Sequence, residues 1–277
     1  MSWQIRGRAP IDGPLLVGIV NVTPDSFSDG GRFFSPEQAI EHGRRLIGDG
    51  ADIVDVGGES TRPGAEAVSE EEESRRVLPV IEALASGGAV VSVDTSKPTV
   101  AWAAIEAGAV IVNDVSASPE MVEIAARTGA GLVMMHMQGT PRTMQVEPTY
   151  VDVVREVRDF LVQRAAFAIE RGVDRSQIVI DPGIGFGKTL DHNLDILTHI
   201  DVLVGTGYPV LIGTSRKSFL GLLTGETMPE RRDLATAATT ALAVAAGVFA
   251  VRVHNVAVSR PAMQVADAMV RNAGVEQ

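Results

Sequence analysis

Leu15-Leu16-Val17-Gly18-Ile19-Val20-Asn21, at residues 15–21, is a short apolar run that ends in a polar side chain, and seven further runs follow it. The eight runs occupy residues 15–20, 51–56, 89–93, 110–112, 131–135, 178–180, 208–212 and 249–251. Each is too short for a helix, and Val and Ile are frequent among them, so β-strand is the better interpretation. The stretches between them have helical spacing. Together they predict an α/β fold, the (β/α)8 TIM barrel, whose active site lies at the carboxyl ends of the strands.

The composition limits the classes of function open to the chain. Its 277 residues fit one barrel, a fold of about 250 residues, so we expect a single domain over residues 1–277. The formal net charge of −11 argues against nucleic acid and anionic membranes as partners. No run of about 20 apolar residues is present that would span a bilayer. The absence of cysteine excludes thiolate catalysis and is compatible with the cytoplasmic location that we expect.

Helix start signals divide the stretches between the strands. Ser35 followed by Pro36 predicts a helix N-terminus. Ser69 and the four glutamates after it predict a capping box whose carboxylates lie in a solvated first turn. Residues 151–171 place apolar side chains on one face, as a helix packed on a sheet requires. Two long polar connections, 22–34 and 57–68, follow the first two strands and are candidate lids over the catalytic rim.

Residues suited to binding occur at the start of the first connection and within both. Asn21, at the end of the first strand, offers a neutral oxygen ligand for Mg²⁺ beside a phosphate. Phe27 is costly to expose to solvent unless it covers a ligand. Arg62, between a hydroxyl and a proline, is suited to capturing an oxyanion. The alternative interpretation is a turn-rich loop and an ordinary surface arginine.

Three polar side chains, Asp94, Asn113 and Asp181, end separate strands and are expected to converge at the mouth of a barrel. Two carboxylates and a carboxamide there would bind a flat heterocycle rich in N–H donors, such as a pterin or guanine-like ring. Any one of them alone could instead cap the following helix. The glycine-rich segment after Asp181 matches neither a P-loop nor a dinucleotide fingerprint. Its glycines are therefore interpreted as bringing the backbone close to a planar ring that stacks on Phe186.

Basic residues follow the last two strands. Arg252 and His254 are two residues apart on the eighth strand, so their side chains are expected to point the same way. The loops after strands seven and eight of such barrels often bind phosphate. We therefore expect these two residues to bind a phosphate or pyrophosphate, with Lys217 adding positive charge.

Taken in order, these segments closely resemble the dihydropteroate synthases, and the match covers nearly the whole chain. The matching segments are 21–31, 55–64, 92–96, 113–116, 135–139, 181–188, 213–221 and 252–255. Members of that family are transferases of folate biosynthesis. They condense 6-hydroxymethyl-7,8-dihydropterin pyrophosphate with p-aminobenzoate to give 7,8-dihydropteroate and pyrophosphate. The resemblance implies the same reaction here, with Mg²⁺ as the cofactor, a homodimer as the assembly, and inhibition by sulfonamides.

The resemblance also implies a role for each motif residue. The pterin would be bound by Asp94, Asn113, Val115, Met137, Asp181, Phe186, Gly213 and Lys217. The pyrophosphate would be bound by Asn21 with Mg²⁺, and by Arg62, Arg252 and His254. The p-aminobenzoate would be bound by Phe27, Ser28, Thr61, Pro63, Lys217 and Ser218. The catalytic residues of an SN1-like displacement would be Asp29, Arg62, Lys217, Arg252 and His254.

Two other functions stay open at this point. A methyltetrahydrofolate-dependent corrinoid methyltransferase has a similar pterin-binding barrel but needs no pyrophosphate site, so Arg252 and His254 count against it. A catalytically silent paralogue that only binds pterin would have no use for complete loops carrying Phe27, Asp29 and Arg62.

Overall fold

The computed structural model describes residues 2–23, 35–60, 67–114, 116 and 118–273. Eight parallel strands form one sheet in the order β8-β7-β6-β5-β4-β3-β10-β9. The strands are β3 (Leu15–Asn21), β4 (Ile53–Gly57), β5 (Val91–Asp94), β6 (Ile111–Asp114), β7 (Gly131–Met135), β8 (Ile178–Asp181), β9 (Leu211–Ile212) and β10 (Ala250–Val253). A parallel bridge between Ile180 and Val210 joins the two ends of this order, so the sheet closes on itself. The predicted (β/α)8 barrel is confirmed.

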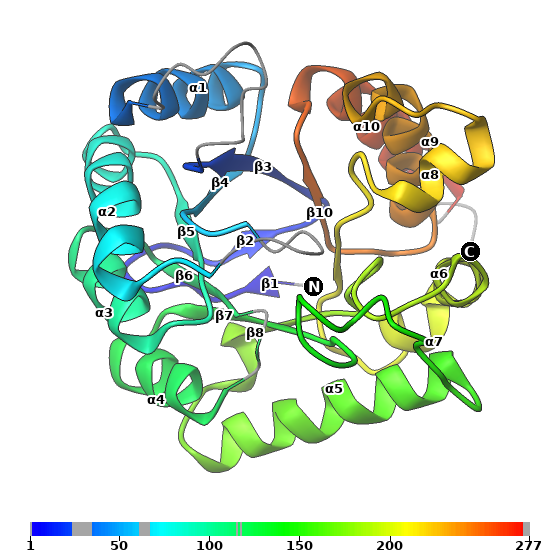
Figure 1. Cartoon of the computed structure of the whole chain (residues 1–277), viewed down its shortest axis with the longest axis horizontal. Coiled ribbons are helices and arrows are strands. Elements are labelled where there is room, and N and C mark those ends of the chain that lie inside the picture. The colour runs from blue at the N-terminus through cyan, green and yellow to red at the C-terminus, as the bar shows by residue number, and fades with distance from the viewer. Residues whose placement is uncertain (1, 24–34, 61–66, 115, 117, 274–277) are drawn as a thin grey trace.

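Helices surround the strands on the outside (Figure 1). They are α1 (Pro36–Gly48), α2 (Glu70–Ser86), α3 (Pro98–Glu106), α4 (Pro119–Thr128), α5 (Val153–Glu170), α6 (Leu190–Thr198), α7 (Ile200–Val204), α8 (Ser218–Thr224), α9 (Asp233–Ala245) and α10 (Val256–Ala273), with short 3-10 helices at Arg175–Gln177 and Pro229–Arg232. In the described part of the chain, none of these helices is both long and apolar enough to cross a membrane.

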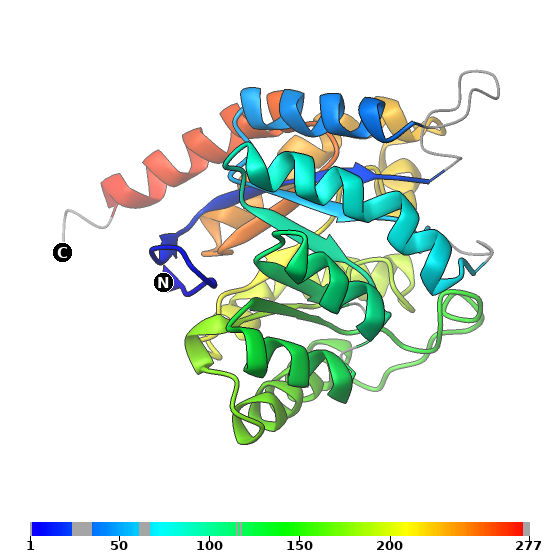
Figure 2. The ribbon, with the colours of Figure 1, turned by 90° about the vertical axis from the view of Figure 1, so that its left-hand side faces the viewer.

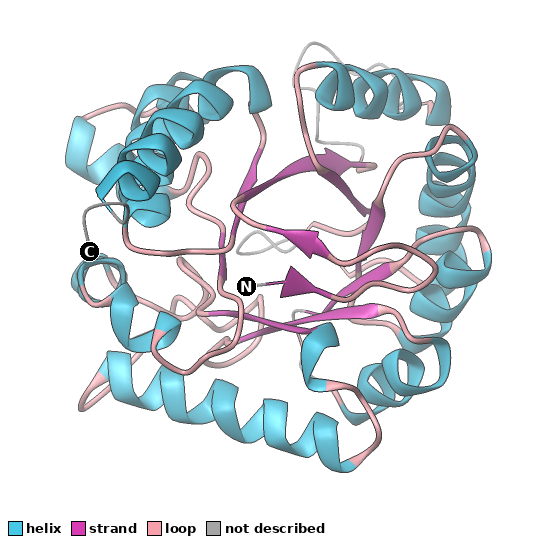
Figure 3. Ribbon diagram, turned by 180° about the vertical axis from the view of Figure 1, so that it is seen from behind, coloured by secondary structure: helices cyan, strands magenta, loops and turns pink. Residues whose placement is uncertain are grey.

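A short N-terminal hairpin covers one end of the barrel. Its strands β1 (Ser2–Trp3) and β2 (Ile11–Asp12) are antiparallel. Trp3 is buried, packs edge-on against Phe249 and donates a hydrogen bond from Nε1 to the carbonyl of Gln177 at 2.7 Å. Figures 2 and 3 show the hairpin at the end of the barrel where the strands begin. The opposite end, where the strands finish, is the one left for a site.

The strands alternate between two apolar layers, because successive side chains point to opposite faces of a sheet. On β3, Leu15 and Val17 belong to the cluster inside the barrel, whereas Leu16 and Val20 pack between the sheet and the helices. Toward the carboxyl ends the buried positions become polar. Those that the site uses are Asp55, Asn113 and Asp181. This change makes the interior apolar at one end and charged at the other.

Most expected element boundaries lie within two residues of the observed ones. The predicted strand 208–212 is the exception, since only Leu211–Ile212 is strand. Pro209 has no N–H to contribute to a ladder, although its carbonyl accepts a hydrogen bond from Ile180 N at 2.9 Å. The prediction for 151–171 is confirmed: Val157, Leu161 and their neighbours along that face of α5 are buried.

The helix start predictions hold only in part. Ser35 precedes α1 but makes no side-chain cap hydrogen bond. Ser69 does cap α2, because its Oγ accepts a hydrogen bond from Glu72 N at 3.2 Å. The solvated first turn is wrong for Glu73, whose side chain is completely buried and ion-paired to Lys97. A capping signal specifies where a helix starts but not which of its first residues will face a neighbouring element.

Candidate active site

Arg252, on β10, links three strands across the polar end of the barrel. Its Nε donates a hydrogen bond to Asp55 Oδ2 at 2.6 Å, and its Nη2 donates to Asp94 Oδ2 at 2.5 Å. Asp55 lies within β4 and Asp94 ends β5. The Arg252 side chain is 21% exposed whereas that of Asp55 is 1% exposed, so the guanidinium reaches from the mouth into the interior. These two ion pairs form the centre of the candidate site.

Asp55 is a site residue that the sequence reasoning missed. Its Oδ2 also accepts a hydrogen bond from Asn113 Nδ2 at 2.9 Å, so one carboxylate oxygen holds both Asn113 and Arg252. Its Oδ1 is buried and meets no hydrogen-bond donor among the described residues. The available signal was a charged residue inside the apolar run 51–56, which is costly unless the charge is paired. Asp55 therefore orients two of the predicted ligand-binding side chains.

Neither Asp94 nor Asn113 caps a helix, which removes the alternative interpretation of these two positions. Asp94 is ion-paired to Arg252, and α3 begins after Lys97 without a side-chain cap hydrogen bond. Beside Asn113, the carboxylate of Asp114 accepts from Ser116 N and Ser118 N. Asp94 and Asn113 are direct partners in the register of β5 and β6. They are thus neighbours at one level of the mouth, as predicted.

Burial and neighbouring charges change the protonation of these groups. Burial raises the pKa of Asp94 to about 7, with Arg252 opposing the rise and the Asp55 carboxylate adding to it. Burial works against the charged form of Arg252, but the carboxylates of Asp55 and Asp94 outweigh it and raise its pKa further. The guanidinium is therefore permanently charged, whereas Asp94 changes charge near neutral pH.

Asp181 and Lys217 form the second half of the mouth. Asp181 Oδ1 accepts a hydrogen bond from Gly183 N at 2.7 Å, and burial raises the pKa of this carboxyl group. Lys217 Nζ donates to the carbonyl of Ile184 and lies 4.5 Å from the centroid of the Phe186 ring. Burial lowers the pKa of Lys217 to about 8, and the Asp181 charge opposes this. One side of Phe186 thus already contacts a cation.

The glycines of the segment 181–188 serve a purpose that the sequence reasoning did not predict. A Cβ on Gly183 would lie 1.9 Å from the carbonyl oxygen of His136, and a Cβ on Gly187 would lie 2.4 Å from that of Gln138. Both glycines have positive φ angles, 65° and 63°. They let this segment lie directly against the backbone after β7. Close approach to another stretch of the protein, rather than to a ring, is what the structure requires of these two positions.

Lys188 connects the segment 181–188 with the backbone after β7. It is 3% exposed, and its Nζ lies 3.0 Å from His136 Nδ1 and donates to the carbonyl of Phe186 at 3.0 Å. Burial lowers the pKa of Lys188 to about 7 and that of His136 to about 3. A neutral His136 can accept a hydrogen bond from the Lys188 ammonium through Nδ1. His136 is therefore a structural histidine, and Lys188 is a second buried cation that the sequence reasoning did not single out.

Arg252 is ion-paired to Asp55 and Asp94, whereas His254 contacts Ser215. His254 Nδ1 lies 2.9 Å from Ser215 Oγ, which also accepts a hydrogen bond from His254 N at 3.0 Å. Arg216, in the same basic cluster, is ion-paired to Asp233 at 2.7 Å. Lys217, the next residue, lies over the Phe186 ring at the mouth. Two of the basic side chains after the last two strands, His254 and Arg216, are thus held by Ser215 and Asp233.

The remaining predicted residues divide into two groups. A Cβ on Gly213 would lie 3.8 Å from Arg252 Cβ and 4.0 Å from Lys217 Nζ, which places this glycine between the two cations. Asn21 pairs in register with Gly57, which in turn pairs with Asp94. Met137 is half-buried after β7, and Ser218 is exposed at the start of α8. Other predicted positions lie outside the described residues: Phe27, Ser28, Asp29, Thr61, Arg62, Pro63 and Val115.

The described residues at the mouth fit a magnesium ion that is held by one protein oxygen, by waters and by substrate phosphates. No group of three or more His, Cys, Asp or Glu is placed to hold a metal within the described ranges. Mg²⁺, however, often keeps most of its waters and takes one or two protein oxygens together with substrate phosphates. The carboxamide of Asn21 at the end of β3 is a donor of that kind.

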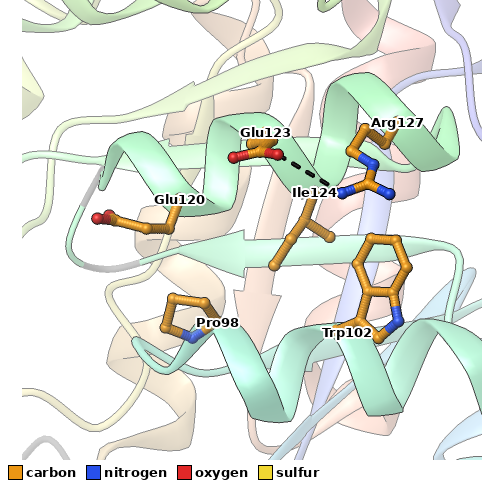
Figure 4. A pocket seen from close by; sticks show the side chains of 6 residues that line it. All are labelled: Pro98, Trp102, Glu120, Glu123, Ile124 and Arg127. Atoms are coloured by element: carbon orange, nitrogen blue, oxygen red, sulfur yellow. Dashed lines mark ion pairs between the residues drawn. The ribbon is translucent and has the colours of Figure 1, made fainter.

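A second hollow lies on the outside of the barrel, between α3 and α4 (Figure 4). Its volume is about 210 Å³, and its lining includes Trp102, over which the Arg127 guanidinium lies at 5.1 Å. Figure 4 also shows the ion pair between Glu123 and Arg127 at 3.5 Å. This hollow is smaller than the usual small-molecule site of roughly 300–1,000 Å³. It contains none of the residues predicted to carry chemistry.

Comparison with known proteins places this geometry in context. The sequence profile of the pterin binding enzyme family matches residues 17–254. The dihydropteroate synthase of Neisseria meningitidis serogroup C is 45% identical over 274 residues, covering 96% of this chain and 97% of that protein.

Solved structures give the same result. The Yersinia pestis dihydropteroate synthase in complex with a sulfonamide drug superposes with a TM-score of 0.91 at 41% identity, over 97% of this chain and 99% of that one. The Xanthomonas albilineans dihydropteroate synthase with 4-aminobenzoic acid superposes with a TM-score of 0.88 at 47% identity, over 94% of each chain.

Proposed function

Because the chain belongs to the dihydropteroate synthase family of pterin-binding enzymes, we propose that it condenses 6-hydroxymethyl-7,8-dihydropterin pyrophosphate with p-aminobenzoate. The products are 7,8-dihydropteroate and pyrophosphate, which makes the chain a transferase of folate biosynthesis. The observation that carries the proposal is the convergence of Asp94, Asn113 and Arg252, through Asp55, at one end of the barrel. We propose further that residues 1–277 act as one catalytic domain.

The pterin binds in the half of the mouth that holds the carboxylates. Its amino-pyrimidine edge presents parallel N–H donors, which the carboxylates of Asp94 and Asp181 accept. Asn113 Nδ2 donates a hydrogen bond to Asp55. The amide oxygen of Asn113 therefore serves as the acceptor for an N–H group of the pterin ring. Met137, Phe186, Gly213 and Lys217 complete the pocket, and Val115 belongs to the same set.

The pyrophosphate binds at the cationic side of the mouth. Two of the five N–H donors of Arg252 are used by Asp55 and Asp94, so the others are available to phosphate oxygens. His254 and Arg62 add donors, and Asn21 would hold Mg²⁺ against the same oxygens. When bound, the ion neutralises charge on the leaving pyrophosphate. The local positive charge works against the net charge of −11 of the chain.

The p-aminobenzoate site is assigned to the two loops after β3 and β4 and to the start of α8. Phe27, Ser28, Thr61 and Pro63 are the loop positions, and Ser218 and Lys217 supply the α8 side. The Xanthomonas albilineans relative was solved with 4-aminobenzoic acid and the Yersinia pestis relative with a sulfonamide, which supports ligands of both kinds for this chain.

The reaction is an SN1-like displacement. The carbon–oxygen bond to the pyrophosphate breaks first, and its electron pair leaves with the pyrophosphate oxygen next to Arg252 and His254. The methylene cation that remains is delocalised into the pterin ring and is favoured by the carboxylates of Asp94 and Asp181. The aniline nitrogen then attacks the methylene carbon and loses a proton to the released pyrophosphate. Asp29 pairs with Arg62 as the loops exclude water from the cation.

The test is a reconstituted reaction of the purified chain with Mg²⁺, the dihydropterin pyrophosphate and p-aminobenzoate. We expect pyrophosphate release that depends on the amine, yields dihydropteroate and is blocked by a sulfonamide. Pterin binding without condensation would contradict the proposal and indicate a silent paralogue. Methyl transfer from methyltetrahydrofolate to a corrinoid protein would indicate the methyltransferase instead.

We also propose that the protein is a homodimer located in the cytoplasm. Large apolar side chains are exposed on the neighbouring helices α9 and α10, among them Leu242 and Met269. Figure 1 shows these two helices side by side on one flank of the barrel. A face of this kind is typical of an interface between protein chains. No nucleic acid or membrane is expected as a partner.

A further inference from the structure

A buried charge cluster lies beside the mouth, apart from the residues assigned above. Lys97, at the N-terminus of α3, donates from Nζ to Glu59 Oε2 at 2.6 Å and to Glu73 Oε2 at 2.5 Å. The Glu73 side chain is completely buried, and those of Lys97 and Glu59 are 17% and 21% exposed. We call Glu59, Lys97 and Glu73 the acidic clamp. It connects the end of β4 with the first turns of α2 and α3.

Glu59 ties together both ends of the loop after β4. Its Oε2 pairs with Lys97, while its Oε1 accepts a hydrogen bond from Val68 N at 2.9 Å. Residues 60–67 lie between these two contacts in the sequence. One carboxylate therefore closes the base of the loop and connects that base to α2 and α3. The loop positions Thr61, Arg62 and Pro63 lie within this closed stretch.

A second contact from α2 holds the same base. Arg76 donates from Nη1 to the carbonyl of Gly58 at 2.9 Å and from Nε to Glu72 at 2.8 Å. The packing leaves no slack, because a Cβ on Gly58 would lie 2.8 Å from Val77 Cγ1 and 2.9 Å from Glu73 Cγ. The position of Gly58 relative to α2 is thus set by close packing against Val77 and Glu73 and by the hydrogen bond from Arg76.

Stability alone explains the acidic clamp poorly. Glu73 Oε1 is buried and meets no hydrogen-bond donor in the described part of the chain. Well-packed apolar residues commonly match or exceed a buried ion pair in stabilising effect. Burial on its own would lower the pKa of Lys97, but the hydrogen bonds that its ammonium donates to Glu59 and Glu73 raise it, so the ammonium stays charged. The chain thus maintains a charged pair at a buried place next to its reaction site.

We propose that Glu59, Lys97 and Glu73 are positioning residues that hold the loop after β4 in the geometry needed for p-aminobenzoate. They act through the loop and do not touch the substrate. The inference rests on the proposed function for its consequence in catalysis, but the anchoring itself is a property of the unliganded chain.

The first test measures anchoring without any substrate. Glu59→Gln keeps an acceptor for Val68 N but removes the charge that faces Lys97. We expect amide hydrogen exchange over residues 60–68 to become about tenfold faster or more in Glu59→Gln and in Lys97→Met, relative to the wild-type chain. Lys97→Arg, which keeps the charge, should restore most of the protection. Unchanged exchange in both disrupting variants would overturn the anchoring.

The second test measures the consequence for the reaction. We expect the KM for p-aminobenzoate to rise about tenfold in Glu59→Gln, while the KM for the dihydropterin pyrophosphate changes less than about twofold. Glu82→Gln, the same change at an exposed position of α2, is the matched control and should leave both values unaltered. Equal rises in both KM values would show a general structural role and overturn the proposal.

The two tests separate the inference from the proposed function. If the wild-type chain forms no dihydropteroate, the proposed function fails, and the exchange measurement still decides whether the acidic clamp anchors the loop. If the chain is active but p-aminobenzoate binding is insensitive to Glu59→Gln, the function stands and the positioning role is refuted. Unfolding of each variant by urea checks that a change in KM does not simply follow a loss of stability.

Discussion

Asp55 receives hydrogen bonds from two predicted ligand-binding side chains through a single oxygen atom. Its side chain lies inside the barrel. Asp55 pairs in register with Ser92, which is two residues before Asp94 and so further from the mouth. A carboxylate that holds both Asn113 and Arg252 sets their spacing before any ligand binds. Such preorganisation lowers the cost of aligning groups during the reaction.

Replacing Asp55 by Asn tests this arrangement. Asp55→Asn removes the charge that pairs with Arg252, so we expect kcat/KM to fall about 100-fold and the free energy of unfolding to fall by about 2 kcal/mol. Steady-state kinetics and urea unfolding measure the two effects. Asp52→Asn is the matched control. Asp52 directly precedes β4, at the end of the strand away from the mouth, and accepts a hydrogen bond from Leu16 N. Equal kinetic losses in both variants would contradict the assignment.

Asp94 makes pterin binding dependent on pH. Burial raises its pKa to about 7, against the effect of Arg252 and with that of Asp55 and Asp181. The carboxylate that accepts N–H donors therefore predominates only above about pH 7, and binding is expected to weaken as the pH falls through that value. The decline should approach about tenfold per pH unit. Calorimetric titration of a pterin ligand at several pH values measures it, and a flat profile would contradict a change in the charge of Asp94 near pH 7.

At the scale of elements, the connections after β7 and β8 depend on each other. Gly183 and Gly187 let the second connection lie against the first, and Lys188 joins them through His136 and the carbonyl of Phe186. Since Lys217 contacts the same connection through Ile184 and Phe186, the pterin side of the mouth is built from three segments that support one another. A local change in one segment should therefore affect all three.

Gly183→Ala should be much more destabilising than an alanine at another glycine with positive φ. The added Cβ would lie 1.9 Å from the His136 carbonyl oxygen, so backbone must shift. We expect a loss of about 3 kcal/mol in the free energy of unfolding. Gly129→Ala, at φ 73° with nothing within 4 Å of the new Cβ, should lose only about 1 kcal/mol. Urea unfolding measures the free energy of unfolding of both variants. Similar losses would mean that the close contact at Gly183 does not add to the cost of the substitution.

At the scale of the whole molecule, the barrel concentrates opposite charges at one end of an acidic protein. Its net charge of −11 repels anions at long range, while Arg252 and Lys217 form a local positive region inside the mouth. Asp55, Asp94 and Asp181 balance this region when the site is empty of substrate charge. The enzyme family to which the chain belongs uses an anionic substrate, so the local balance rather than the net charge governs binding.

The dimer proposal predicts a mass of two chains for the wild-type protein. Leu242 and Met269 are 72% and 70% exposed on α9 and α10. Leu242→Glu combined with Met269→Glu should yield monomers, because charges buried in an apolar interface are unfavourable. Light scattering coupled to gel filtration measures the mass. Val151→Glu, at an exposed position before α5, is the control and should leave the mass unchanged.

Sequence patterning was sufficient for the fold and for most of the residues brought to the mouth. Strands, helices and the polar ends of strands are local features, and a period of two or of 3.6 residues reports them directly. The barrel then brings Asp94 and Asn113 together as register partners on adjacent strands, and the long side chain of Arg252 reaches Asp94 from β10. The family resemblance added the chemical identity of the substrates.

Partnerships between charges were decided only by the tertiary structure. Arg252 reaches Asp55 across 197 positions of the chain, and Glu73, expected in solvent, is buried against Lys97. His254 contacts Ser215, whereas Arg252 contacts Asp55 and Asp94. An ion pair depends on distances of a few ångströms between residues far apart in sequence, and these distances exist only after the barrel has closed. For this reason the sequence determined which groups line the mouth, and the closed barrel determined which of them hold one another.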